Sequence, residues 1–206
     1  MHSLPRNVQK LIDAFVKLPG IGPKTASRLV LYILHSPNQF SQDFGNNLLS
    51  LKQNVKFCSN CYNLSENDFC LICSDEKRTQ QKIIVVEDIL DLLAFENIGE
   101  YNGTYHVLGG LISPMQGVGP ENLNIGGLLT RVRKAASNQK SKLELIIATN
   151  PSLEGEATAM YIREEVARID KDITISRIAR GLPTGADLDY ADKITLLRSF
   201  EGRVKI

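Results

Sequence analysis

Hydrophobic residues in the first quarter of the chain recur with the 3.6-residue period of α-helices. Three helices are predicted: one over the apolar positions of 8–16, one from Pro23 or Lys24 to about Leu34, and a weaker one over 42–53. Pro23 suits the first position of a helix, because its missing N–H would have no intrahelical partner there. The three apolar faces are formed, in order, by Val8, Leu11, Ile12, Phe15 and Val16, by Ala26, Leu29, Val30 and Ile33, and by Phe44, Leu48, Leu49 and Leu51.

From residue 82 onward, short β-branched runs alternate with helical patterns. The strands are predicted at KIIVVE, TYHVL, LELIIAT and ITISRIA, which begin at residues 82, 104, 143 and 173. Helices are predicted after Asp88, which can cap the first of them, and over 124–138 and 154–169. Residues 109–121 form a Gly/Pro-rich loop. This alternation predicts an α/β fold with a mainly parallel sheet and helices on its faces.

The composition of the 206 residues, 43% hydrophobic and 23% charged, is typical of a globular protein. Purely apolar runs such as IIVV at 83–86 are far shorter than the ~20 residues of a membrane-spanning helix. The N-terminus MHSLPRNVQK has no apolar stretch of the kind that directs secretion. We therefore expect a cytoplasmic protein without membrane contact.

Charge is distributed unevenly, although the net charge is only +1. Residues 1–57 hold seven lysines and arginines against Asp13 and Asp43, a balance of +5. The balances of 58–85 and 86–206 are −1 and −3. A positive N-terminal quarter indicates either a local contact with a polyanion or a solvated basic helix surface.

All four cysteines, Cys58, Cys61, Cys70 and Cys73, follow the spacing C-x2-C-x8-C-x2-C. Each C-x2-C pair can present two thiolates to one metal ion from a tight turn, and two pairs complete the tetrahedral site that zinc prefers. No other cysteine or histidine lies in this window, so four ligands close the site. Disulfide pairing is the alternative, but no feature indicates an oxidising compartment. The spacing therefore predicts a structural zinc ion.

The segment LPGIGPKTASRL at 18–29 places a G-I-G turn between two predicted helices. Gly20 and Gly22 allow a sharp turn and a close approach to another molecule. The N–H groups that open the second helix have no intrahelical partners and favour anions, and Lys24 and Arg28 share one helical face. The segment resembles the helix–hairpin–helix motif, which grips DNA phosphates without reading bases. An ordinary helical hairpin would also use glycines to turn the chain.

Acidic side chains follow two of the predicted strands, and the carboxyl ends of parallel strands meet at one edge of a sheet. Glu87 closes KIIVVE, and ATNPSLEGEATA begins within LELIIAT. The pattern resembles the Toprim module of topoisomerases and primases, where a Glu after the first strand and a D-x-D after the third bind magnesium. Asn150 and Ser152 occupy the D-x-D positions here, so magnesium binding is expected to be weak or absent. Glu87 and Glu154 are either metal ligands or ordinary surface and helix-start charges.

The order of these parts resembles the RecR family of bacterial recombination mediators over essentially the whole chain. The likeness is carried by LPGIGPKTASRL, C-x2-C-x8-C-x2-C, YHVLGGLISPMQGVGPENL, ATNPSLEGEATA and RIARGLPTGADLDYADKITLLRSFEGR. On this organisation the chain has a helix–hairpin–helix domain over 1–56, a four-cysteine zinc finger over 57–79, a Toprim domain over 80–178 and a C-terminal segment over 179–206.

The resemblance implies a non-enzymatic, DNA-binding mediator of recombinational DNA repair. It would work with RecO, and with RecF where present, to load RecA on DNA covered by single-strand-binding protein. It implies sequence-independent DNA contact through Lys24, Arg28 and the glycine turn, and a homo-oligomer, either a dimer or a tetrameric ring that clamps DNA. It also implies a nucleoid-associated protein in the cytoplasm. Glu87 and Glu154 would mark a Toprim surface used for partner contact.

Two other classes of function stay open on the residues alone. One is a Toprim nuclease or primase-like phosphoryl transferase that uses magnesium at Glu87, and the other is a zinc-stabilised scaffold without DNA contact. No P-loop and no G-x-S-x-G motif is present. The histidines His2, His35 and His106 are scattered along the sequence. His106, in a predicted strand, and Tyr161, in a predicted helix, are expected to be packing residues.

Overall fold

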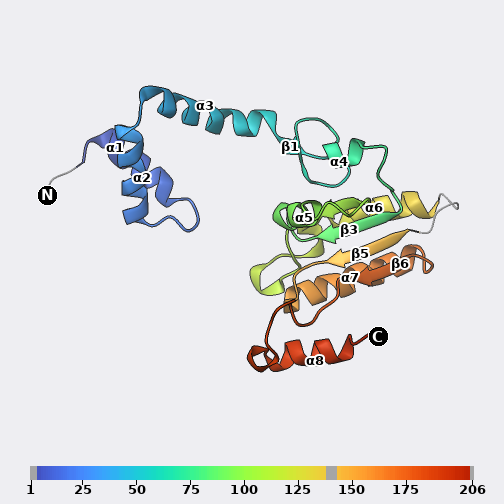
Figure 1. The fold of residues 1–206 in the computed structure, drawn as a ribbon. Coiled ribbons are helices and arrows are strands. Elements are labelled where there is room, and N and C mark those ends of the chain that lie inside the picture. Colours follow the sequence, from blue (N-terminus) through green and yellow to red (C-terminus); the bar gives the residue numbers. More distant parts are fainter. Residues whose placement is uncertain (1–3, 138–142, 205–206) are drawn as a thin grey trace. The chain divides into compact units, whose positions relative to one another are not determined.

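The computed structural model describes residues 4–137 and 143–204 and divides into two compact units, Met1–Val55 and Lys56–Ile206. The first unit is helical, as predicted (Figure 1), with α1 (Arg6–Val16), α2 (Pro23–His35) and α3 (Asn38–Asn54). Its small core is formed by buried Ile12, Ala26 and Val30, with Val8, Phe15 and Ile21 packed against them. The first two predicted apolar faces therefore meet each other.

The third helix differs from its prediction in length and in burial. It begins at Asn38 instead of residue 42, directly after Pro37, whose fixed φ suits a helix start. None of the 17 residues of α3, all of them described, is buried. Phe44, Leu48, Leu49 and Leu51 are all exposed. The apolar periodicity thus identified the helix correctly but marks a surface instead of a core contact.

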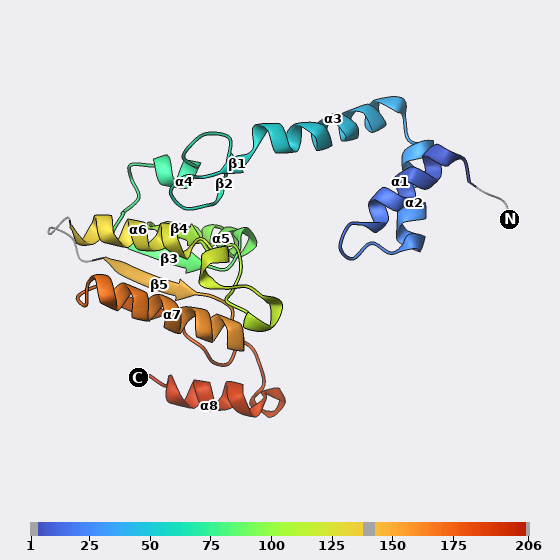
Figure 2. The same ribbon diagram turned by 180° about the vertical axis from the view of Figure 1, so that it is seen from behind.

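The second unit begins with three short elements that the sequence pattern did not predict: β1 (Lys56–Phe57), β2 (Leu64–Ser65) and α4 (Leu71–Ser74). The predicted alternation follows (Figures 1 and 2). Its elements are β3 (Lys82–Val86), α5 (Ile89–Glu96), β4 (Thr104–Val107), η1 (Pro114–Gln116), η2 (Pro120–Asn122), α6 (Ile125–Ala136), β5 (Glu144–Ala148), α7 (Leu153–Ile169), β6 (Thr174–Arg177), η3 (Leu188–Tyr190) and α8 (Lys193–Glu201). Residue 138, the expected end of the helix before β5, and His2 lie outside the described residues.

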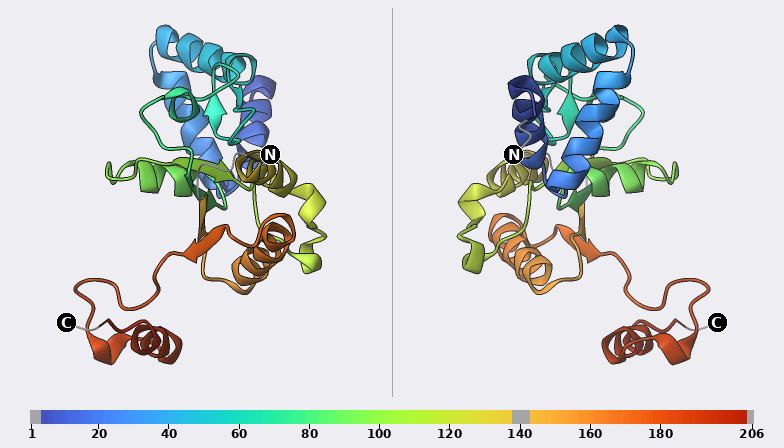
Figure 3. Two further views of the ribbon diagram at one scale, coloured as in Figure 1. Left: turned by 90° about the vertical axis from the view of Figure 1, so that its right-hand side faces the viewer. Right: turned by 90° about the vertical axis from the view of Figure 1, so that its left-hand side faces the viewer.

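The four longer strands form one sheet in the order β4-β3-β5-β6. All three strand pairs are parallel, which confirms the predicted sheet. Ile83, Val85, Leu145 and Ile147 belong to the cluster that packs under α6 and α7, whereas alternate residues such as Val86 face Leu92 of α5. Figure 3 accordingly shows α5 on one side of the sheet and α6 and α7 on the other.

Two aspartates fix the starts of helices in this unit. Asp88 caps α5, since its side chain accepts hydrogen bonds from the N–H groups of Leu90 and Asp91, as the sequence predicted. Asp192 caps α8 in the same way. The C-terminal segment is tied to α7 by an ion pair between Arg180 and Glu156. These contacts fix the starts of α5 and α8 and attach the C-terminal segment to α7.

Across 4–137 and 143–204, the helices are all too short or too polar to span a membrane.

Candidate functional site

The turn between α1 and α2 leaves its backbone open. Gly20 has φ +79°, in the left-handed region that glycine adopts without strain. A Cβ built on Gly20 or on Gly22 would meet no atom within 4 Å. Gly22 precedes α2, and no side chain caps the free N–H groups at its start. The turn therefore presents unshielded N–H groups that an anion can approach closely.

Two cations stand at this helix start without acidic neighbours. Lys24 and Arg28 are both exposed, and the first turn of α2 holds no acidic residue. Within the described part of the chain, neither side chain takes part in an ion pair. Their charges are thus available to a ligand and add to the positive end of the helix dipole.

The carboxyl ends of β3 and β5 converge, as predicted, and side chains from the two strand ends are hydrogen-bonded to each other. Asn150 Nδ2 donates to Glu87 Oε2 at 2.7 Å. Ser152 caps α7, because its Oγ accepts from the N–H of Gly155 at 3.0 Å. Both residues at the D-x-D positions therefore have structural tasks. Asn150 occupies one oxygen of the Glu87 carboxylate as a hydrogen-bond donor.

Two further acidic residues near this edge, Glu154 and Glu156, differ in whether they form ion pairs. Glu154 is exposed on the first turn of α7. Glu156, which sequence reasoning did not single out, forms ion pairs with Arg177 at 2.8 Å and with Arg180. Within the described residues, Glu87 and Glu154 belong to no group of three or more acidic, His or Cys side chains spaced to hold a cation.

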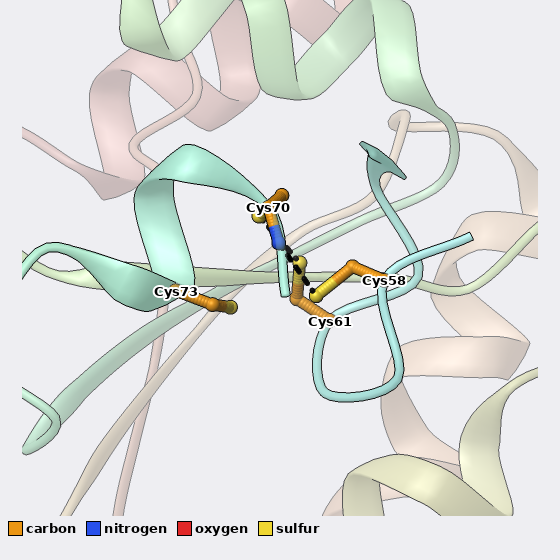
Figure 4. Close-up of side chains that lie close together, drawn as sticks. All are labelled: Cys58, Cys61, Cys70 and Cys73. Atoms are coloured by element: carbon orange, nitrogen blue, oxygen red, sulfur yellow. Dashed lines mark hydrogen bonds between the residues drawn. The ribbon is translucent and has the colours of Figure 1, made fainter. Parts of the chain in front are cut away.

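The four cysteine sulfurs form the one such group among the described residues, all within 4.8 Å of one another. Cys58 and Cys61 lie in the turn after β1, whereas Cys70 precedes α4 and Cys73 lies within it (Figure 4). All four thiols are free, so the disulfide alternative is not adopted. Two sulfurs bound tetrahedrally to one zinc ion stand about 3.8 Å apart, and the Cys61–Cys70 sulfur separation is 3.5 Å. The donor set fits a structural zinc ion.

Hydrogen bonds from N–H groups add to the fit. The Cys70 N–H donates to Cys58 Sγ at 3.4 Å, and Asn60 Nδ2 donates to Cys73 Sγ at 3.3 Å. Such donors favour thiolates. The neighbouring thiols Cys70 and Cys73, followed by burial, raise the pKa of Cys61. A bound cation would offset the mutual repulsion of four thiolates in this cluster.

This four-cysteine knuckle, residues 58–73, covers the β4 edge of the sheet. The strand β4 is an edge strand, and its Val107 N–H donates to the Cys61 carbonyl at 2.9 Å. Tyr62 packs its ring edge-on against His106, with ring centroids 5.3 Å apart. Tyr62 adopts φ +63°, which is uncommon for a residue other than glycine. The tight turn after Cys61 thus aims an aromatic ring at the sheet.

Comparison with known proteins identifies the family. The chain is 48% identical over 204 residues to the recombination protein RecR of Streptococcus mutans serotype c, with 98% of each chain covered. It is 46% identical over 199 residues to the protein of that name from Herpetosiphon aurantiacus, covering 97% of this chain and 94% of that one. The chain belongs to the RecR family. The predicted resemblance is therefore confirmed over nearly the whole length.

RecR family models also match the parts one by one. A RecR helix-hairpin-helix model matches residues 8–51, and a RecR zinc finger model with four cysteine ligands matches 55–75. A Toprim domain model matches 81–179, and a RecR C-terminal model matches 181–204. Together with the sulfur cluster, the second of these matches supports zinc binding. The Toprim match covers all four strands of the parallel sheet, β3, β4, β5 and β6.

Several residues around the RecR knuckle escaped sequence reasoning. A Cβ on Gly127 of α6 would collide with the Tyr62 ring, so that glycine makes room for the knuckle. Arg131, one helical turn later, donates to the carbonyl of Tyr105 on the edge strand. The only available signals were a bulky residue directly after a C-x2-C pair and a glycine inside a helical pattern. Neither identifies its partner.

Proposed function

We propose that this chain is a recombination mediator that binds DNA and catalyses no reaction on it. In this proposal it acts in the cytoplasm on the nucleoid, together with RecO and, where present, RecF. Its task is to load RecA on single-stranded DNA covered by single-strand-binding protein. The observation that carries the proposal is the open glycine turn with exposed Lys24 and Arg28 in a member of the RecR family.

The mode of DNA contact follows from the chemistry of this turn. Backbone N–H groups and two cations recognise phosphate oxygens, which are the same for every base. The hairpin presents Gly20, Gly22, Lys24 and Arg28 together, with no acidic residue in the first turn of α2. Binding through them is therefore independent of sequence and strongly dependent on salt.

The absence of catalysis is proposed from the state of the strand ends. Phosphoryl transfer with magnesium requires several carboxylates around the ion. Glu87 is instead hydrogen-bonded by Asn150, and Ser152 is engaged as a helix cap. The zinc centre has four protein ligands and keeps no open position for a substrate. Glu87 and Glu154 are proposed to contact RecO as surface charges.

An assay of RecA loading tests this function. We expect the chain, together with RecO, to accelerate RecA assembly on single-stranded DNA covered by single-strand-binding protein. Glu87→Lys or Glu154→Lys should weaken RecO binding about 10-fold, since charge reversal adds repulsion to the lost attraction. Glu164→Lys is the matched control, because Glu164 is exposed further along the same helix as Glu154. Fluorescence of labelled RecA measures the loading, and titration calorimetry measures the complex.

Three outcomes would contradict the proposal. The first is RecA loading that is the same with and without the chain. The second is RecO affinity that is unchanged in both strand-end variants or reduced equally by the control. The third is labelled DNA that is cut or extended in the same magnesium-containing reactions by the parent chain and left intact by Glu87→Ala.

We further propose a homo-oligomer, either a dimer or a tetrameric ring around DNA. The exposed apolar face of α3, with Phe44, Leu48 and Leu49, is the kind of surface that a second copy covers. Light scattering is expected to give two or four times the 22.9 kDa of one chain. Leu48→Asp with Leu49→Asp should lower that mass, whereas Lys52→Asp on the same helix should not. A monomeric mass at high concentration, with and without DNA, would count against an oligomer.

A further inference from the structure

Arg131 on α6 carries a positive charge that lacks a carboxylate partner. Its Nη1 donates to the Tyr105 carbonyl at 2.6 Å and approaches His106 Nδ1 at 3.4 Å, and its Nη2 donates to Thr104 Oγ1 at 2.9 Å. Each of these acceptors is electrically neutral. In the portion of the chain that the structure describes, Arg131 makes no ion pair. A guanidinium stays charged in proteins, so its charge requires compensation.

His106, the nearest titratable neighbour, does not supply the compensation. Burial, followed by the charge of Arg131, lowers the pKa of His106 to about 3, so the ring is neutral at pH 7. Arg131 can only donate, so Nδ1 of His106 is the acceptor. The proton therefore lies on Nε2, which donates to the Asn124 carbonyl at 2.9 Å. A neutral imidazole in this tautomer does not neutralise the positive charge of the guanidinium.

The four-cysteine knuckle lies on the same side of α6 as Arg131. Gly127, four residues before Arg131 and so on the same helical face, is the position against which the Tyr62 ring packs. Tyr62 directly follows Cys61, and the Cys61 carbonyl accepts a hydrogen bond from the Val107 N–H of β4. Arg131 donates to the Tyr105 carbonyl of the same strand. Burial lowers the pKa of Arg131, and thiolates at Cys73, Cys61 and Cys58 would act in the opposite direction. The contacts at the β4 edge thus place Arg131 beside the knuckle, where thiolate charge would favour its charged form.

A zinc ion held by four thiolates has a net charge of about −2. Cys58, Cys61 and Cys70 are all buried, and burying net charge without a partner is costly. The two N–H donors to sulfur, from Cys70 and Asn60, carry no full charge. Lys56, at the start of the knuckle region, is already paired with Asp68 at 2.6 Å.

We propose that Arg131 is the counter-ion of the zinc–thiolate centre. Its guanidinium offsets part of the negative charge of the metal site while its hydrogen bonds attach it to the outer edge of β4. The metal and the sheet edge are thereby coupled through one residue of α6. Arg131 acts through the ligands and does not bind the metal, so it is a positioning residue.

Zinc affinity measured by competition with a chromophoric chelator tests this role in the full-length chain. Arg131→Gln retains a hydrogen-bond donor and removes the charge, and we expect it to weaken zinc binding about 10- to 100-fold, as for other partners outside the ligand shell. Arg131→Lys retains the charge and should stay within about threefold of the parent. Arg133→Gln, at an exposed position of the same helix, is the matched control and should match the parent. Cobalt substitution shows whether four sulfurs still bind in each variant.

The outcomes separate charge compensation from simple scaffolding. Parent-like zinc affinity in Arg131→Gln overturns the proposal, as does an equal loss in Arg131→Gln and Arg131→Lys. Thr104→Val removes one neutral partner of Arg131 and keeps its charge, so it should lower the thermal stability while zinc affinity stays within about threefold. If Arg131→Gln fails to fold, the comparison of Arg131→Lys and Thr104→Val still decides. A loss of 10-fold or more in either one overturns the proposal.

Discussion

Replacing Cys58 with serine is expected to abolish zinc binding and to cause the largest loss of stability of any single change considered for this chain. Binding energy at a structural zinc site is folding energy, about 10–16 kcal/mol in zinc-finger peptides. Three of the four ligands that lose their metal are buried, and the knuckle of residues 58–73 has little other core. A gently purified parent should contain one zinc per chain, and Cys58→Ser well under one.

The effect should spread to the sheet edge, because the knuckle covers β4. The Val107 N–H is protected by the Cys61 carbonyl, so hydrogen exchange at Val107 should accelerate strongly when zinc is lost. Amides of the interior strand β5 should remain protected, because β3 and β6 flank that strand on both sides. Exchange measured by NMR, before and after chelation of the parent, separates these two regions.

Ser59→Ala provides the matched control for this prediction. Ser59 lies in the same turn as Cys58, and its side chain is exposed. Its zinc content, thermal unfolding and exchange at Val107 should equal those of the parent. Well under one zinc in the parent, or a Cys58→Ser variant as stable as the parent, would show that the cluster is not a metal-dependent element.

Features that are periodic or closely spaced along the chain could be predicted from the sequence. The parallel sheet followed from the alternation of strand and helix patterns, the cap from Asp88 at a helix start, and the four-cysteine cluster from its C-x2-C pairs. Burial of His106 was expected from its place in a strand, and packing of Tyr161 against the core from its place in a helix. Such features are decided by local backbone geometry and by the need to bury apolar side chains.

The remainder depends on partners that are distant in sequence. Asn150 and Glu87 are 63 residues apart, yet they are hydrogen-bonded to each other at the strand ends. Arg131 reads as an ordinary helix-surface cation until the fold places Tyr105 and the knuckle beside it. The strands β1 and β2 have two residues each, too few to show a period. The alternation of strands and helices predicted that the ends of β3 and β5 meet, but neither it nor the composition could predict these particular side-chain contacts.

Reversing the charges of Lys24 and Arg28 together is expected to weaken DNA binding about 100-fold or more. Each reversal removes an attraction of ~1 kcal/mol at a solvated phosphate and adds a comparable repulsion, and 1.4 kcal/mol corresponds to a factor of ten in affinity. Both side chains are exposed and make no ion pair in the described part of the chain. The variant should therefore fold and hold zinc like the parent. In an oligomer, the loss would be multiplied over the copies that contact one DNA strand.

The salt dependence gives a second, independent measure of the same contacts. For single-stranded DNA, the slope of log K against log salt is about −0.7 per phosphate contact. Losing two contacts should make it shallower by about 1.4 for each hairpin engaged.

The matched control is Lys10→Glu with Lys52→Glu, which makes the same change in net charge on α1 and α3 of the helical unit. If this control weakened binding and reduced the slope as much as Lys24→Glu with Arg28→Glu, the contact would be a diffuse effect of charge. A double variant that bound DNA like the parent would place the contact elsewhere. A loss confined to Lys24 and Arg28 assigns it to the start of α2, where the free N–H groups of the turn complete the phosphate site.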